Sequence, residues 1–160
     1  MRPRRVLVPL SFALLTLSAS LAFAEGAKPV QVALFNPVQI FNEKESISGL
    51  RLNLLYGVNQ NVQGFDWGLV NVTRGNELGW QDGLVNITNG EFTGLATGFF
   101  NQTQDGNGLQ YGFVNVAKHM HGVQLGVINM TETMHGLQVG IANIIQKGKI
   151  PFLPIINWSF

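Results

Sequence analysis

The chain has no cysteine among its 160 residues, so neither disulfide bonds nor thiolate metal sites support its fold. Charged residues are scarce, at 12% of the chain, and after position 24 no apolar run is long enough for a membrane-spanning helix. The formal net charge of +1 includes Arg2, Arg4 and Arg5 at the start of the chain, so the remainder is slightly acidic. We therefore expect neither a helical membrane protein nor a nucleic-acid partner.

The sequence also lacks a catalytic constellation. Nucleophile, base and orienting groups must converge, but the carboxylates are spread over the chain without paired partners, and no Gly-rich stretch has the pattern of a phosphate loop. Beyond residue 25 these carboxylates are Glu43, Glu45, Asp66, Glu77, Asp82, Glu91, Asp105 and Glu132. We expect a protein that is not an enzyme and that uses no cofactor.

Histidine is rare as well, with His119, His121 and His135 as its only occurrences. His121 and His135 each precede a glycine of the repeat described below, so paired or stacked strands would bring them together, as a metal site requires. No carboxylate recurs beside them to complete a ligand set. We therefore predict polar residues that flank a turn, and no metal.

Residues 1–24 have the three-part layout of a secretory signal peptide. Arg2, Arg4 and Arg5 form a basic start, an apolar run extends from Val6 to about Leu17, and Ala22-Phe23-Ala24 offers a small-x-small cleavage site. We expect an exported chain with one β-repeat domain at residues 25–160. The predicted location is the outer membrane or the cell surface, with the periplasm as the alternative.

What the chain has in abundance is an eight-residue unit with Gly at positions 1 and 5 and Asn at position 8. Six clear copies follow one another at a nearly constant step, and worn copies at Gly49 to Tyr56 and Ile150 to Asn157 extend the array to about residues 49–157. The clear copies place the repeat residues at Gly64, Gly68, Asn71, Gly79, Gly83, Asn86, Gly94, Gly98, Asn101, Gly108, Gly112, Asn115, Gly122, Gly126, Asn129, Gly136, Gly140 and Asn143. We expect these residues to be structural.

Positions 2, 4 and 6 of each unit are mostly apolar, which is the period of a strand. Two glycines per unit would cost a helix about 1 kcal/mol each. Between units, Gly75, Gly90 and Gly106 lie beside Asn or Asp, as in tight turns. One strand and one turn per repeat, at a period of about 14–15 residues, predict an all-β fold, an up-and-down antiparallel meander with a further strand at Val30 to Phe35.

The register of this meander can be written down. Folding Met130 against Met134 places Leu125 opposite Val139 and Gly126 opposite Gln138. Closure of the meander into a small barrel would remove its exposed edges, and the alternating apolar residues before the terminal Phe160 resemble the last strand of outer-membrane barrels.

A β-solenoid is the alternative to the meander. Each repeat would then form one coil, and the position-8 asparagines would stack into an amide ladder, with a second ladder from Gln110, Gln124 and Gln138.

Aromatic residues occupy strand positions in several copies of the unit. They are Trp67, Trp80, Phe99, Phe100, Tyr111 and Phe113. We predict that they pack in the core or, in a barrel, contact lipid. A sugar-binding platform is the alternative.

Several segments together resemble the surface-repeat family of bacterial proteins, which was first described in spirochaetes. The resemblance covers about Val32 to Phe160 and includes ALFNPVQIF at residues 33–41, GLRLNLLYG at 49–57, the tandem GLQxGxxN copies, and the ending PFLPIINWSF. It implies a location in the Gram-negative cell envelope and no known activity. We expect a structural protein, with outer-membrane lipid as one partner. The alternative is a soluble or peripherally attached module that binds a protein or a glycan.

Overall fold

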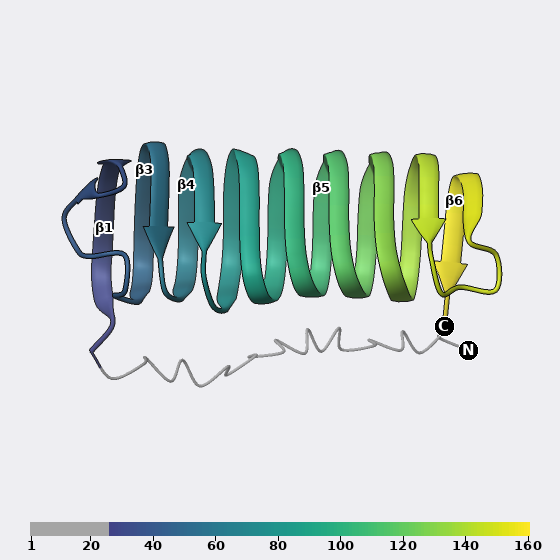
Figure 1. The fold of residues 1–160 in the computed structure, drawn as a ribbon, viewed down its shortest axis with the longest axis horizontal. Helices are drawn as coiled ribbons and strands as arrows, with labels where there is room; N and C mark the ends of the chain where they lie inside the picture. Colours follow the sequence, from purple (N-terminus) through teal and green to yellow (C-terminus); the bar gives the residue numbers. More distant parts are fainter. Residues whose placement is uncertain (1–25) are drawn as a thin grey trace, which may run out of the picture.

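A computed structural model describes residues 26–160, and the predicted signal peptide at residues 1–24 lies outside them. The described chain contains strands and no helix, which confirms the all-β prediction. The strands are β1 (Lys28–Phe35), β2 (Val38–Gln39), β3 (Ile47–Asn59), β4 (Val62–Thr73), β5 (Glu77–Ile145) and β6 (Phe152–Ser159). β5 is a continuous extended segment that winds through several coils (Figure 1).

The repeats stack as parallel coils, and the fold is a β-solenoid. β3 pairs with β4, and β4 with β5, in parallel, so Gly49 lies beside Gly64, which lies beside Gly79. The alternative that the sequence left open is therefore the observed architecture. The antiparallel meander is wrong, and the strands do not close into a barrel, because each unit returns to the start of the next coil along the same helical path.

The corner that makes this path possible lies at the first glycine of each unit. Gly122 has a φ of 134°, a conformation that side-chain-bearing residues rarely adopt. A Cβ there would also collide with the carbonyl oxygen of Gly108 on the preceding coil. The prediction of tight turns at Gly90 and Gly106 is wrong, since these residues are extended within β5 and neither has a positive φ.

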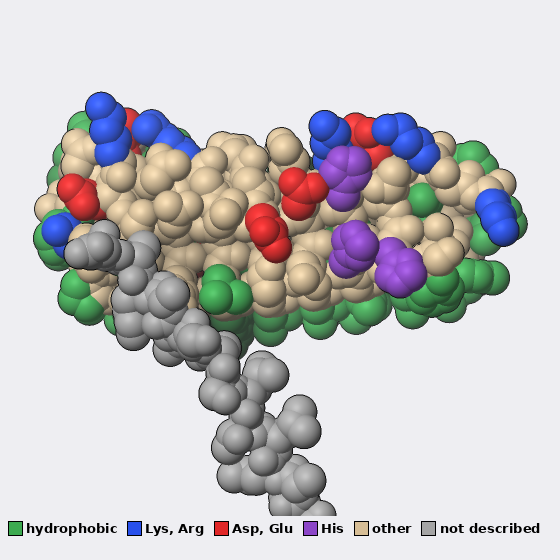
Figure 2. All heavy atoms as spheres, turned by 90° about the horizontal axis from the view of Figure 1, so that it is seen from below, with side chains coloured by type: hydrophobic (Ala, Val, Ile, Leu, Met, Phe, Trp, Pro, Cys, Tyr) green, Lys and Arg blue, Asp and Glu red, His purple; other side chains and the backbone are tan. Residues whose placement is uncertain are grey.

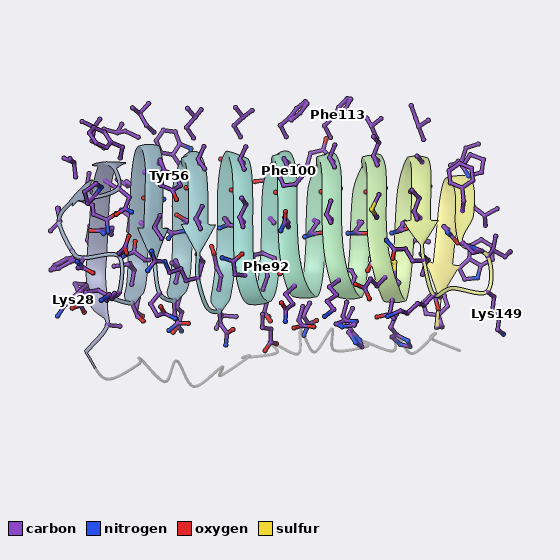
Figure 3. The ribbon with its side chains drawn as sticks, viewed as in Figure 1. Lys28, Tyr56, Phe92, Phe100, Phe113 and Lys149 are labelled. Atoms are coloured by element: carbon purple, nitrogen blue, oxygen red, sulfur yellow. The ribbon has the colours of Figure 1, made fainter. Side chains whose placement is uncertain are left out.

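Polar ladders fill much of the interior. Asn101 Nδ2 donates to Asn115 Oδ1 at 2.9 Å, and equivalent bonds of 2.8–2.9 Å join the asparagines from Asn53 to Asn143. Gln138 and Gln124 continue a second ladder to Gln110 with bonds of 2.7 Å. Phe92, Met120 and Met134 are buried apolar side chains, and Phe92 lies in the lower part of the coils (Figure 3).

The observed ladders overturn the predicted hairpin around residues 131–133. Asn129 Nδ2 donates to Asn143 Oδ1 at 2.8 Å, although the hairpin would hold these residues far apart. Gly126 faces the backbone of Gly112 and the amide of Asn115 rather than Gln138. A parallel step of one repeat produces both contacts, since it places each repeat residue over its own equivalent.

The two ends of the stack depart from the repeat. β1 confirms the strand predicted at Val30 to Phe35 and pairs with β3 in parallel. At the other end β6 runs antiparallel to the last coil, with Leu137 opposite Trp158. The prediction that Ile150 to Asn157 is a further copy at the same step is therefore wrong, because the chain reverses at the turn after Ile145 and lays β6 against the end of the stack.

The first worn copy keeps the interior intact by exchanging two residues. Asn53 stands where the unit has its second Gly, and Gly57 stands where the unit has its Asn, opposite Asn71. The Asn53 side chain fills the space that a side chain at residue 57 would need. Its Nδ2 donates to Asn71 Oδ1 at 2.8 Å, so the amide ladder begins one coil before the first clear copy.

Candidate binding face

The side chains at positions 2, 4 and 6 of each unit point away from the polar interior. Position 3 is buried, position 5 is a glycine and position 8 is the buried asparagine, so the apolar residues between them must face outward. We call this surface the apolar face. Its position-2 and position-4 residues are Leu50, Phe65, Trp80, Leu95, Leu109, Val123, Leu137, Leu52, Trp67, Asp82, Thr97, Tyr111, Leu125 and Val139.

Position 6 lies at the upper edge of the coils, where Phe113 projects beyond the ribbon (Figure 3). We call this column the apolar ridge, and its residues are Leu54, Leu55, Leu69, Leu84, Phe99, Phe113, Val127 and Ile141. The ridge is unusually open for aliphatic and aromatic side chains, since Phe99 is 52% exposed and Ile141 is 72% exposed. These side chains therefore stand clear of the coil at its convex edge.

The asparagine ladder fixes the backbone under this ridge. Asn86 Nδ2 donates to the carbonyl oxygen of Thr97 at 2.8 Å as well as to Asn101 Oδ1 at 2.8 Å. One amide thereby joins the end of one unit to position 4 of the next coil. A Cβ at the intervening glycine, Gly98, would collide with the backbone oxygen of Gly83 and crowd both amides. Glycine at position 5 and asparagine at position 8 are thus spatially coupled, and together they hold the ridge in place.

Aromatic rings on the apolar face contact one another across coils. Phe99 and Phe113 stack with ring centroids 4.8 Å apart and planes at 5°, while Phe65 meets Trp80 edge-on at 5.1 Å. A surface hollow of about 610 Å³ is lined by Tyr111, by the stacked rings of Phe99 and Phe113, and by the backbone of Gly112. The prediction that the aromatic residues pack in the core is wrong for Trp67, Trp80, Phe99, Tyr111 and Phe113, which are exposed.

Two coils interrupt the apolar face with a polar pair. Thr97 Oγ1 donates to Asp82 Oδ1, and the indole Nε1 of Trp80 donates to Thr97 Oγ1 at 3.0 Å. Asp82 and Thr97 are the two departures from apolar character that the sequence shows at position 4. Because their polar atoms bond to each other and to the indole, they form a local cluster within an otherwise apolar surface.

Charged side chains gather on the opposite edge of the coils. Figure 2 views the molecule from this edge. Apolar side chains, in green, line one long side of the view, and the charged and histidine side chains lie over the rest of it. Lys147 Nζ lies 2.8 Å from Glu132 Oε2, and an Arg74 Nη lies 2.7 Å from Glu43 Oε1. The molecule is therefore amphipathic across its width.

The histidines lie on this charged edge. His121 and His135 stand on successive coils with ring centroids 5.7 Å apart, and His135 meets Phe160 of the chain end at 5.8 Å. His119 Nδ1 lies 2.7 Å from Thr133 Oγ1. A hollow of about 330 Å³ brings Glu91 and Asp105 beside His119 and His121. Within residues 26–160, no group of three or more His, Asp or Glu side chains is arranged to hold a metal ion.

The early coils enclose a charged cluster that the sequence analysis did not find. Arg51 Nε donates to Asp66 Oδ1 at 2.7 Å, and both side chains are fully buried. Glu77 Oε2 accepts from Thr73 Oγ1 at 2.6 Å and from Gln81 Nε2 at 2.7 Å. Burial, and then the neighbouring charge of Asp66, raise the pKa of Glu77 to about 8. A neutral Glu77 beside the Arg51–Asp66 pair leaves the cluster without net charge.

At the start of the array, this cluster occupies the position that the glutamine ladder occupies in later coils. Arg51, Asp66 and Gln81 occupy position 3, the position of Gln110 and Gln124 in later coils. The shared position in the unit was the signal that could have located the pair. The chemistry is structural, since the guanidinium and the carboxylate have no exposed surface.

No helix in the described part of the chain is long and apolar enough to cross a membrane. Comparison of the chain with models of protein families, with curated proteins and with solved structures gives no match.

Proposed function

We propose that the protein is an exported, non-enzymatic scaffold of the cell envelope that attaches to a partner surface through its apolar face and ridge. The single observation that carries this proposal is the column of apolar side chains from Leu54 to Ile141, all of them exposed except the half-buried Val127. A contiguous apolar patch larger than a few hundred Å² is rare on monomeric soluble proteins and marks an interaction site.

The distribution of titratable groups supports a role without catalysis. The most strongly interacting carboxylates and the Arg51 guanidinium are enclosed among the early coils, where they balance one another's charge. The apolar face presents Asp82 as its one carboxylate, and this group accepts from Thr97. Attachment by a rigid apolar surface requires no reacting group, which fits a structural module. The predicted export signal at residues 1–24 and the resemblance to the surface-repeat family favour the cell envelope as the location.

The proposal is tested by making the ridge polar in cells. In the variant Leu84→Ser/Phe99→Ser/Phe113→Ser, three exposed ridge residues lose their apolar side chains, so the protein should move from the envelope fraction into the soluble fraction. The matched control is Gln102→Ser/Gln104→Ser/Asn107→Ser, which changes three exposed polar residues in the same region and should leave the distribution unchanged.

Thermal unfolding of both purified triple variants shows whether the coil is retained. A ridge variant that folds like the parent and still sediments with the envelope would refute attachment through this surface.

A further inference from the structure

We infer that the surface to which the ridge attaches is a lipid bilayer, and that the solenoid lies along the bilayer with its ridge in the headgroup and acyl boundary. This inference rests on the proposed function and names its partner. It follows from the shape of the ridge, the area of the apolar face, the satisfaction of the backbone and the placement of charge.

The shape of the apolar surface favours a fluid partner. The exposed ridge residue Phe113 stands at the upper edge of the coils, where the chain turns, rather than on the flat of a sheet (Figure 3). Apolar side chains continue round this edge, since Val85, Phe100 and Val114 at position 7 are half-buried there. A rigid protein partner covers one side of a convex ridge, whereas lipid can surround both sides.

The area of the flat part is too small for a stable contact between two copies. Positions 2 to 6 span about 13 Å along the strand, and the coils from Gly49 to Gly136 extend about 29 Å at a strand spacing of about 4.8 Å. The product is about 400 Å², which is half of the roughly 800 Å² per partner in a stable protein interface. A second copy seated on this footprint would therefore bury less surface than a stable dimer needs.

The backbone of the coils is already suited to an apolar phase. Lipid tolerates a backbone only when its N–H and C=O groups are bonded internally. In the solenoid these groups pair between successive coils, as the register of β3, β4 and β5 shows. The unpaired edges of the stack lie at its two ends, so immersion of the ridge places no open sheet edge in lipid.

Residue types and charge complete the match. Trp67, Trp80 and Tyr111 stand on the apolar face beside the ridge, and such side chains prefer the boundary between apolar and aqueous regions. The exposed ion pair of Lys147 with Glu132 and the histidines lie on the opposite edge (Figure 2). A cylinder with one apolar side and one charged side binds in the plane of a membrane surface.

The direct test is tryptophan quenching by lipid. Trp67 and Trp80 report on the apolar face, the third tryptophan is removed by Trp158→Phe, and the segment before Gly26 contains none. The full chain is mixed with vesicles of phosphatidylcholine brominated in the acyl chains, which carry no net charge. We expect a blue shift and strong quenching, and loss of both in the Leu84→Ser/Phe99→Ser/Phe113→Ser variant.

Flotation with the same vesicles gives the matched comparison, because every variant keeps the same N-terminal segment. The ridge variant should partition about tenfold more weakly than the Gln102→Ser/Gln104→Ser/Asn107→Ser control. Unquenched tryptophans, or equal flotation of the two triple variants, would overturn the lipid assignment. If the ridge variant still left the envelope in cells, the proposed function would stand with a different partner, and sedimentation would show whether that partner is a second copy.

Discussion

The asparagines from Asn71 to Asn129 each make two kinds of hydrogen bond with the coil that follows. Asn101 donates to Asn115 Oδ1 at 2.9 Å and to the Tyr111 carbonyl oxygen at 3.1 Å, while its own Oδ1 accepts from Asn86. A buried polar group that loses its partner costs about 1–3 kcal/mol. The ladder therefore stabilises the fold mainly because each asparagine from Asn71 to Asn129 has a ladder neighbour on both sides.

Asn101→Ala should remove these bonds and leave the Asn86 amide without one acceptor. We expect a loss of about 1–3 kcal/mol in the free energy of unfolding for each buried group left unpaired, measured by urea denaturation. Gln102→Ala is the control, because Gln102 is the next residue and is exposed. Equal losses in the two variants would show that the ladder contributes nothing specific.

Glu77 links stability to pH. Its pKa of about 8 in the folded protein lies above the ordinary value of 4.5, so the folded chain holds a proton that the unfolded chain has released. Stability from this group is complete below about pH 4.5 and falls as the pH rises toward 8, by up to about 1.4 kcal/mol per pH unit.

Glu77→Gln should abolish this dependence, since an amide does not titrate and still accepts hydrogen bonds. The free energy of unfolding, measured in urea between pH 5 and 9, should fall with pH more steeply in the parent than in the variant. Parallel pH profiles for the two proteins would mean that the buried carboxyl is not protonated in the folded state.

At the scale of the coil, one glycine per turn sets the path of the chain. Gly122→Ala forces a side chain into a φ of 134° and against the Gly108 carbonyl. Backbone strain alone should cost about 1–3 kcal/mol, measured as a lower melting temperature. His121→Ala changes the exposed neighbour and should have little effect. A Gly122→Ala protein that melts like the parent would contradict the placement of the corner.

The period of the coil was predictable from sequence, but the direction of its side chains was not. Alternation of apolar residues at positions 2, 4 and 6 identified strands and suggested a core beneath them. In the coil the inward positions carry amides such as Gln124 and Asn129. Their hydrogen bonds are satisfied because stacking brings Gln124 beside Gln110 and Asn129 beside Asn115. A polar interior of this kind inverts the usual pattern, so the exposed apolar face appeared only once the coils were stacked.

Strand direction was ambiguous for a related reason. The sequence shows one turn-rich segment per repeat, which suits a hairpin, and the second corner is hidden within the Gly-containing unit. Leu125 and Val139 are neighbours in both arrangements, so apolar pairing did not discriminate between them. The repeated asparagine distinguishes the two arrangements, since the hydrogen bond from Asn129 to Asn143 exists only in the parallel stack.

At the scale of the whole molecule, each coil adds one short section to a surface that runs along the axis of the stack. Each coil contacts its immediate neighbours, as in other repeat proteins, so the stacked coils (Figure 1) place the exposed position-6 residues one after another along the stack. β1 with β2, and β6, close the two ends. The ridge is consequently a property of the array rather than of any single repeat.

The most direct test of this account is the distance between Gln104 and Gln146, which are exposed and lie three coils apart. With spin labels on Gln104→Cys and Gln146→Cys in this cysteine-free chain, parallel stacking predicts backbones separated by about 14 Å, at about 4.8 Å per coil. An antiparallel meander would place these residues at opposite ends of its strands, about 30 Å or more apart. A short label-to-label distance from double electron–electron resonance supports the solenoid, and a distance beyond about 30 Å would contradict it.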